Sequence, residues 1–445
     1  VKQIRDIIEN FPDHGIRDVF SLYPTKDAVA SILALSRLQS VAYYADARLE
    51  ANGNNGSVMN FLTAALSSTT YSEITSSEGM LNERELLEEL AHYSAFAHAA
   101  YGWKMGLLSG RVHFGDRDML LSKTGIKRRN LIKASRKSKT HLPAYFIARD
   151  VKRSKIVLCI RGTLSAKDIL TDLCCTAEDF ISYEDEIKFN KYVNDTKSEF
   201  FRAEFRTKYR ARAHQGMLEA ARGVARMTHK VISSELASKP NYELVIVGHS
   251  LGGGVAAILG TFWKDTFPGL KVYGYGSPCV GPIDSHPTTS DSIISVVGEG
   301  DPFSCLSLGH LADASYMLCK LCEDKKLREE ILNNTRFDIE DMDEAQVKWC
   351  VKTMKNLTKN IELNTEKFYP PGRVFQMKGS LFGGADGVTL TEVSQESAFR
   401  NLRFHPRMFD LSLHIPHRYE VLLSRIWANA KNCNRDAEES AFRNL

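Results

Sequence analysis

Two apolar runs of different character stand close together between residues 243 and 263. Glu243 to Val247 is rich in β-branched residues, as expected for a parallel strand that is buried on both faces. Val255 to Trp263 is apolar and alanine-rich, which favours a buried helix. Between them stands the sequence Gly248-His249-Ser250-Leu251-Gly252. The pattern therefore predicts a strand, a tight turn that contains a serine, and a helix.

Five further runs predict strands of the same sheet. Pro143 to Ala148 and Lys155 to Ile160 flank a charged turn, which is typical of a hairpin. The remaining strand candidates are Lys271 to Tyr275, Ser292 to Val297 and Val374 to Lys378. We expect an α/β fold of the α/β-hydrolase type, with a mostly parallel central sheet, helices on both faces, and a helical region before it.

Apolar residues at helical spacing mark both ends of the chain. They run from Val29 to Val41, again from Asn82 onward, and finally from His417 to Ala430. The charge-rich segment Leu306 to Leu363 has one apolar helical stripe and is predicted to be a helical insertion. The predicted organisation is a helical N-terminal region over residues 1–94, an α/β domain over 95–430 with the insertion at about 306–363, and a C-terminal tail over 431–445.

The composition is that of an ordinary globular protein. Of 445 residues, 25% are charged and 43% hydrophobic, and the net charge of +4 does not by itself indicate an acidic partner. Nine cysteines are an odd number in a large chain, so we expect a reducing compartment. No run of 18 apolar residues occurs, which predicts no transmembrane segment in this chain. The chain begins at Val1 instead of methionine, so an upstream anchor stays open.

The segment Lys123 to Lys139 contains eight lysines and arginines and no acidic residue. It could be a solvated loop, a surface that binds an anionic membrane, or a nucleic-acid patch. No nucleic-acid-binding motif accompanies it, so we expect no nucleic acid as partner. We expect this segment to touch a membrane surface, which places the protein on the cytosolic side, peripheral to a membrane or anchored at it.

Two patterns could suggest a metal, and neither has the required spacing. Cys319 and Cys322 form a C-x-x-C, but no second pair follows at the distance of a zinc ribbon. The acidic residues from Asp338 to Glu344 lack the glycine and the ligand spacing of a calcium-binding EF-hand loop. We therefore expect no metal site and no cofactor-binding site.

The turn at residues 248–252 has the G-x-S-x-G spacing of a nucleophile elbow. Its glycines permit a strained turn at the end of the strand, so Ser250 is the candidate nucleophile. A serine hydroxyl needs a base to remove its proton, and an imidazole base needs a carboxylate that fixes its tautomer. Asp301 follows the strand candidate at 292–297, and His414 precedes a proline that can start a helix. Ser250, Asp301 and His414 occur in the chain order of α/β-hydrolases.

Other residues compete for the roles of acid and base. Asp284 and Asp291 precede the strand, so they rank below the carboxylate that follows it. His417 and His405 compete with His414 as the base.

The backbone amides of Thr163 and Leu251 are the candidates for an oxyanion hole. Thr163 follows a strand and a glycine, and Leu251 opens the helix after the serine. An N-cap role for Thr163 is compatible with this assignment. Cys174 to Arg212 is too long for a simple connection, so this segment or the insertion at 306–363 is expected to cover the site.

These motifs resemble the sn-1-specific diacylglycerol lipases, within the class 3 (fungal triacylglycerol lipase-like) α/β-hydrolases. The likeness covers roughly Ala95 to Ala430. Two departures are Leu413, where that family usually has an acidic residue, and the lack of its multi-helix membrane anchor in this chain. The residues that resemble the family are Tyr101-Gly102-Trp103, Arg161-Gly162-Thr163-Leu164-Ser165, the elbow at 248–252, Tyr369-Pro370-Pro371-Gly372-Arg373 and His414-Ile415-Pro416.

The resemblance implies a serine lipase that cleaves the sn-1 fatty-acyl ester of diacylglycerol through an acyl-serine. It implies Ser250, Asp301 and His414 as the catalytic residues and Thr163 in the oxyanion hole. It also implies that no cofactor is required for the chemistry, that calcium can stimulate activity, and that the insertion is regulatory. The alternatives are a general triacylglycerol lipase, a phospholipase A1, and a lipase-like scaffold without turnover.

Overall fold

The structure is a computed structural model of the chain, and it divides into two compact units. The first unit comprises residues 1–79, 308–366 and 401–410, and the second comprises residues 80–307, 367–400 and 411–445. Each unit is assembled from segments that are distant in the sequence. The described residues are 16–51, 77–108, 115–139, 141–163, 177–179, 212–283, 285–335, 342–359, 361, 366–381, 387–399 and 411–443.

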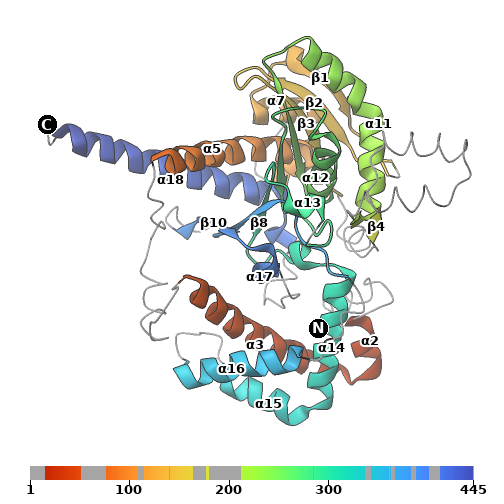
Figure 1. Cartoon of the computed structure of the whole chain (residues 1–445), viewed down its shortest axis with the longest axis vertical. Coiled ribbons are helices and arrows are strands. Elements are labelled where there is room, and N and C mark those ends of the chain that lie inside the picture. Colours follow the sequence, from red (N-terminus) through yellow and green to blue (C-terminus); the bar gives the residue numbers. More distant parts are fainter. Residues whose placement is uncertain are drawn as a thin grey trace, which may run out of the picture. The chain divides into compact units, whose positions relative to one another are not determined.

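The second unit is built around an eight-stranded sheet (Figure 1). Strands β3, β6, β7, β8 and β9 are parallel, and antiparallel strands complete the sheet at each edge. The predicted hairpin and the predicted α/β fold class are confirmed. In spatial order the strands are β1 (Leu131–Ser135), β2 (Tyr145–Asp150), β3 (Lys155–Ile160), β6 (Glu243–His249), β7 (Lys271–Tyr275), β8 (Ile293–Gly298), β9 (Arg373–Lys378) and β10 (Thr389–Val393).

Alternate residues of the central strands form the core on one face of the sheet. Val245 and Val247 of β6 and Tyr273 and Tyr275 of β7 are fully buried there. They pack against apolar residues of helices α5 (Ser77–Ala99), α7 (Asp116–Thr124) and α18 (Pro416–Arg443). The period of two matches the pleat of a strand, so the intervening residues point to the opposite face.

Helices α11 (Gln215–Ala237) and α12 (Leu251–Trp263) pack together against that opposite face. Helix α12 contacts β6 and β7, and it is buried almost throughout its length. The shorter elements of this unit are α6 (Trp103–Leu108), η1 (Arg128–Asn130), α13 (His286–Thr289), η2 (Pro302–Cys305), α17 (Gln395–Phe399), η5 (Leu411–Leu413) and the two-stranded sheet of β4 (Ala177–Asp179) and β5 (Arg212–His214).

The first unit is helical. Helix α3 (Thr25–Ala51) contacts α2 (Ile16–Leu22), α14 (Leu308–Glu323), α15 (Lys325–Asn334) and α16 (Glu344–Thr358). The buried Arg328 donates to Asp27 at 2.6 Å and thereby ties α15 to the first turn of α3. The segment predicted to be an insertion contains α14, α15 and α16, and these helices pack with the N-terminal helix α3.

The predicted segment boundaries differ from this division. The boundary near residue 94 falls inside α5, because Leu90, Tyr93 and Phe96 of that helix are part of the sheet core. The predicted tail from residue 431 continues α18 as far as Arg443. Most of the predicted cover, residues 180–211, lies outside the described residues.

The basic segment 123–139 is not a loop. It forms the end of α7, the turn η1 and the edge strand β1. Lys123 is buried against Glu420, whereas most of the other basic side chains are exposed. Within the described residues no helix is long and apolar enough to cross a membrane.

Candidate active site

Ser250 lies at the sharp turn between β6 and α12. It adopts φ 58° and ψ −134°, a strained conformation for a residue with a side chain. Its backbone N–H donates to the Tyr275 carbonyl at 2.9 Å, which fixes the turn to the neighbouring strand β7. A Cβ on Gly248 would lie 2.0 Å from the Gly252 carbonyl oxygen, so the turn requires glycine there. The elbow predicted from the sequence is present.

His414 and Asp301 lie together at the carboxyl end of the parallel strands. His414 follows η5, and Asp301 follows β8 and caps η2. Their Nδ1 and Oδ2 atoms are 2.7 Å apart, and the Asp301 side chain is fully buried. Residues 113 positions apart in the sequence are therefore joined in a solvent-excluded pair.

This pair determines which nitrogen of His414 can act as a base. An ionised carboxylate only accepts hydrogen bonds, so the proton of a neutral His414 lies on Nδ1 and Nε2 has a free lone pair. Among the described residues His414 Nε2 is buried and makes no hydrogen bond. A buried acceptor without a partner is costly, and such atoms are characteristic of catalytic sites.

Two more donors hold the Asp301 carboxylate. The Tyr419 hydroxyl donates to Oδ2 at 2.7 Å, and the Phe303 N–H donates to Oδ1 at 3.0 Å. Burial, together with the negative charge of Asp301, raises the pKa of Tyr419 well above its usual value, so this hydroxyl keeps its proton. The sequence pattern did not point to Tyr419, although its position five residues after His414 could have suggested this contact with Asp301.

His249 forms a second buried link to His414. Its Nε2 lies 2.7 Å from the His414 carbonyl oxygen, and its Nδ1 lies 2.7 Å from the Tyr101 hydroxyl. A carbonyl can only accept, so Nε2 bears the proton and the Tyr101 hydroxyl donates to Nδ1. Burial, with a smaller contribution from nearby His414, lowers the pKa of His249 well below 6.5. His249 is therefore neutral at physiological pH and rigidly oriented.

The strand end that leads to Thr163 packs directly on the elbow. A Cβ on Gly162 would lie 2.5 Å from the His249 carbonyl oxygen and 2.8 Å from Ser250 Cβ. Only glycine allows this close approach, and it brings the chain at Thr163 next to the serine. Leu251 is the first residue of α12, where backbone N–H groups lack intrahelical partners. Thr163 follows Gly162, and Leu251 follows Ser250. Gly162 and Ser250 pack against each other, so the two candidate oxyanion residues lie beside this contact.

The other candidates for the acid and the base lie elsewhere in the structure or outside the described residues. Asp291 is exposed at the amino end of β8, and its charge acts on Arg373. His417 Nδ1 lies 3.8 Å from Glu420, at the start of α18. Asp284 and His405 lie outside the described residues.

His98, His417 and Glu420 are the group that could hold a metal ion in the described part of the chain. Lys123 Nζ lies 2.8 and 2.7 Å from the two Glu420 oxygens, and His98 Nδ1 lies 2.5 Å from Oε2. Burial acts to raise the pKa of Glu420, but the neighbouring His417, His98 and Lys123 lower it strongly. The Lys123 ammonium thus already pairs with the Glu420 carboxylate, and the cluster links α5, α7 and α18.

Comparison with known proteins identifies the family of the region around Ser250. Residues 157–308 match the profile of the family described as Lipase (class 3). Diacylglycerol lipase-beta of Mus musculus is 27% identical over 272 residues, 54% of this chain and 37% of that protein. Secreted mono- and diacylglycerol lipase 1 of Fusarium solani is 30% identical over 145 residues, 32% of this chain and 35% of that protein. A solved structure of MDLA from Penicillium cyclopium covers 74% of this chain and 95% of its own, with 15% identity and a TM-score of 0.43.

The matched region contains Thr163, Ser250 and Asp301, whereas His414 follows it in the chain. The family that these residues match, the class 3 lipases, consists of carboxylic ester hydrolases. The relationship to the diacylglycerol lipases is distant and extends over about half of the chain. The chain in turn spans well under half the length of these curated relatives.

Replacing Tyr101 by phenylalanine should destabilise the sheet unit. The change leaves His249 Nδ1 buried without a donor, which costs about 1–3 kcal/mol of unfolding free energy. Urea unfolding measures the loss of unfolding free energy, and hydrogen exchange of the β6 amides is a second readout. Tyr145→Phe is the matched control, because the Tyr145 hydroxyl makes no hydrogen bond to any described residue. Equal stability of the two variants would contradict the link.

The stability of the sheet unit should fall as the pH drops below about 6.5. The unfolded chain protonates His249 near that pH and the folded chain does not, so the unfolded state binds more protons. Each such histidine contributes up to about 1.4 kcal/mol per pH unit. Urea unfolding between about pH 7 and pH 5 should therefore show a shallower slope for His249→Gln than for the wild type. An unchanged slope would show that His249 is protonated in the folded state.

Proposed function

We propose that this chain is a serine lipase that hydrolyses the sn-1 fatty-acyl ester of diacylglycerol. The products are monoacylglycerol and a free fatty acid, and the intermediate is an acyl-serine at Ser250. The observation that carries the proposal is the buried Asp301–His414 pair, whose unpaired Nε2 lies in the same unit as a strained serine elbow.

Acylation begins when His414 Nε2 takes the proton of the Ser250 hydroxyl. The Ser250 Oγ then attacks the ester carbonyl carbon, and the resulting oxyanion is held by the amides of Leu251 and Thr163. His414 returns the proton to the glyceride oxygen as the ester bond breaks. Asp301 stabilises the imidazolium that exists between these two transfers.

Deacylation repeats the sequence with water. His414 removes a proton from water, the hydroxide attacks the acyl carbonyl, and the proton returns to Ser250 as the fatty acid leaves. Each step conserves its protons, and the side chains and amides named above carry out every transfer in this proposal. The calcium stimulation implied by the family resemblance stays a prediction.

Diacylglycerol is supported as the substrate by the names of two relatives. One is a diacylglycerol lipase-beta and the other a secreted mono- and diacylglycerol lipase. The catalytic residues do not distinguish among glyceride esters, because every ester presents the same carbonyl to the serine. The acylglycerol class therefore follows from the relatives, and the sn-1 position from the family resemblance.

A membrane surface on the cytosolic side is the proposed location of the substrate. The exposed basic residues beside β1 support this proposal, since each cation near an anionic bilayer contributes about 1 kcal/mol of attraction. The exposed members are Lys127, Arg128, Arg129, Arg136, Lys137 and Lys139.

A fluorophosphonate probe should label the chain at Ser250. Ser250→Ala should abolish labelling and reduce ester hydrolysis by roughly 10⁶-fold, and Asp301→Asn should reduce it by about 10⁴-fold through loss of the correct His414 tautomer. Ser238→Ala, an exposed serine of the same unit, is the control and should retain full labelling. A folded wild-type chain that resists the probe would favour the scaffold without turnover.

A panel of glycerolipids, each labelled in one acyl chain, tests which lipid and which ester position the protein prefers. We expect release of the sn-1 acyl chain of diacylglycerol in vesicles to exceed release from triacylglycerol and phospholipid by at least about tenfold. A preference for triacylglycerol would favour a general lipase. A preference for the sn-1 chain of phospholipid would favour a phospholipase A1.

A further inference from the structure

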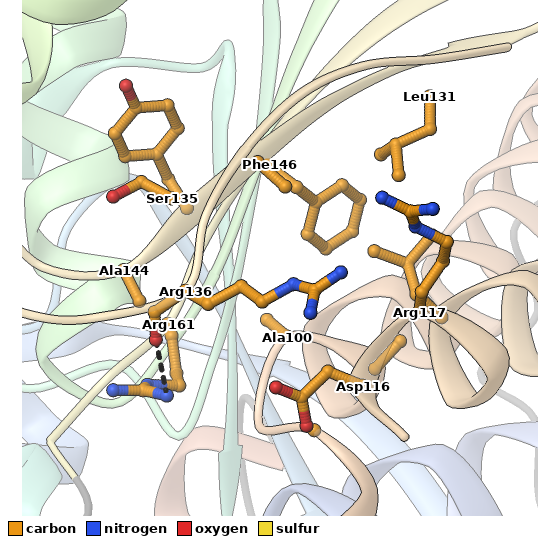
Figure 2. A pocket seen from close by; sticks show the side chains of 14 residues that line it. Ala100, Asp116, Arg117, Leu131, Ser135, Arg136, Ala144, Phe146 and Arg161 are labelled. Atoms are coloured by element: carbon orange, nitrogen blue, oxygen red, sulfur yellow. Dashed lines mark hydrogen bonds between the residues drawn. The ribbon is translucent and has the colours of Figure 1, made fainter. Parts of the chain in front are cut away.

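A small pocket beside the end of β3 has a strongly positive lining. Its volume is about 40 Å³. Arg117 of α7, Arg136 after β1 and Arg161 after β3 line it, and Asp116 is its one carboxylate. Figure 2 shows the side chains of Arg117, Arg136 and Asp116 directed toward the same space. With three guanidinium groups and one carboxylate, the lining has a formal charge of +2.

None of these arginines forms an ion pair with a described residue. Arg117 and Arg136 are exposed, and their side chains make no hydrogen bond or ion pair to a described residue. Arg161 donates to two neutral groups, the Arg136 carbonyl at 3.5 Å and Ser138 Oγ at 3.0 Å. Asp116 accepts a hydrogen bond from the Trp103 N–H at 3.1 Å, which uses part of its accepting capacity.

Two other arginines of the same unit are each paired with an acid. Arg149 binds both carboxylate oxygens of Glu235, and Arg373 binds both of Glu392. Like charges that share an opening repel one another, and one carboxylate cannot balance three guanidinium groups. An anion in the pocket would remove that repulsion.

The walls of the pocket strengthen this preference. Leu120 and Phe146 are buried, and Leu131 is half-buried beside them. Apolar walls lower the local dielectric, so charges interact more strongly there than in bulk water. Burial also lowers the pKa of Arg161, which reflects the cost of holding this cation away from water, although the charge of Asp116 acts in the opposite direction.

We propose that this pocket binds a phosphate monoester group. A monoester has a charge of about −1.5 to −2 near neutral pH, which matches the lining, and planar guanidinium groups bind phosphate oxygens in pairs. The pocket exceeds the roughly 10–15 Å³ that a single water needs and is far below the roughly 300–1,000 Å³ of a site for a whole drug-sized ligand. It accepts a head group and not an acyl chain.

The phosphate can belong to a membrane lipid or to a soluble ester, and both present the same group. Arg161 directly precedes Gly162, which packs on the serine elbow. A lipid head group in the pocket would thus hold this end of the sheet at a bilayer. This site goes beyond ester hydrolysis, and binding is measured without turnover, so its failure would leave the hydrolase proposal intact.

Binding is tested on the complete chain with two probes. Calorimetry with glycerol 3-phosphate measures the soluble arm, and flotation measures the lipid arm. The vesicles are phosphatidylcholine with phosphatidate, or with phosphatidylserine at matched charge. We expect binding of glycerol 3-phosphate and preferential flotation with phosphatidate. Both should weaken by about tenfold or more in Arg117→Gln/Arg136→Gln, which removes two charged donors.

The matched control is Lys230→Gln/Lys264→Gln. It removes the same charge from two exposed cations of the same unit that lie outside the pocket and outside the basic segment 123–139. The control should retain both activities, and unchanged melting temperatures show that each variant is folded. Binding of glycerol 3-phosphate without preference for phosphatidate supports the site with a soluble occupant. Absence of both, or equal loss in the two variants, would overturn the proposal.

Discussion

A buried carboxylate must be hydrogen-bonded, and the requirement at Asp301 organises the site. Three donors satisfy it: His414 Nδ1, the Tyr419 hydroxyl and the Phe303 N–H. Two of them come from the C-terminal segment and one from the turn after β8, so the carboxylate joins the sheet to the segment that bears His414. The same three bonds fix the tautomer of His414. The stability of this part of the fold and the basicity of His414 Nε2 therefore both depend on the Asp301 carboxylate.

A second chain of hydrogen bonds supports the same histidine from the opposite direction. Tyr101 donates to His249, and His249 donates to the backbone carbonyl of His414. Because His249 immediately precedes Ser250, the elbow and the base loop are held to one another through a neutral imidazole. Burial keeps this imidazole uncharged, which avoids a second positive charge beside His414 when that residue takes a proton. The unit starts earlier than the sequence pattern indicated, because Leu90 and Tyr93 of α5 already belong to the sheet core.

Local patterns were sufficient for the features that depend on neighbouring residues. The elbow, the strands of the parallel sheet and the helical insertion follow from apolar periodicity and glycine positions, and the chain order led to Asp301 and His414. Edge strand β1 was not foreseen, because lysines that protect an exposed edge resemble a solvated loop in sequence. The Tyr101–His249 and Lys123–Glu420 contacts join residues 148 and 297 positions apart. Such contacts depend on how helices dock on the sheet, which no local pattern records.

The central claim is that one serine, one buried histidine–carboxylate pair and two amides form a single reaction centre. A crystal structure of the chain after reaction with a fluorophosphonate tests it directly. The account predicts phosphorus bonded to Ser250 Oγ, with the phosphoryl oxygen about 2.7–3.1 Å from the amides of Thr163 and Leu251. His414 Nε2 should lie within hydrogen-bonding distance of Ser250 Oγ or of the leaving-group position. Phosphorus on another residue, or a phosphoryl oxygen directed away from both amides, would contradict the account.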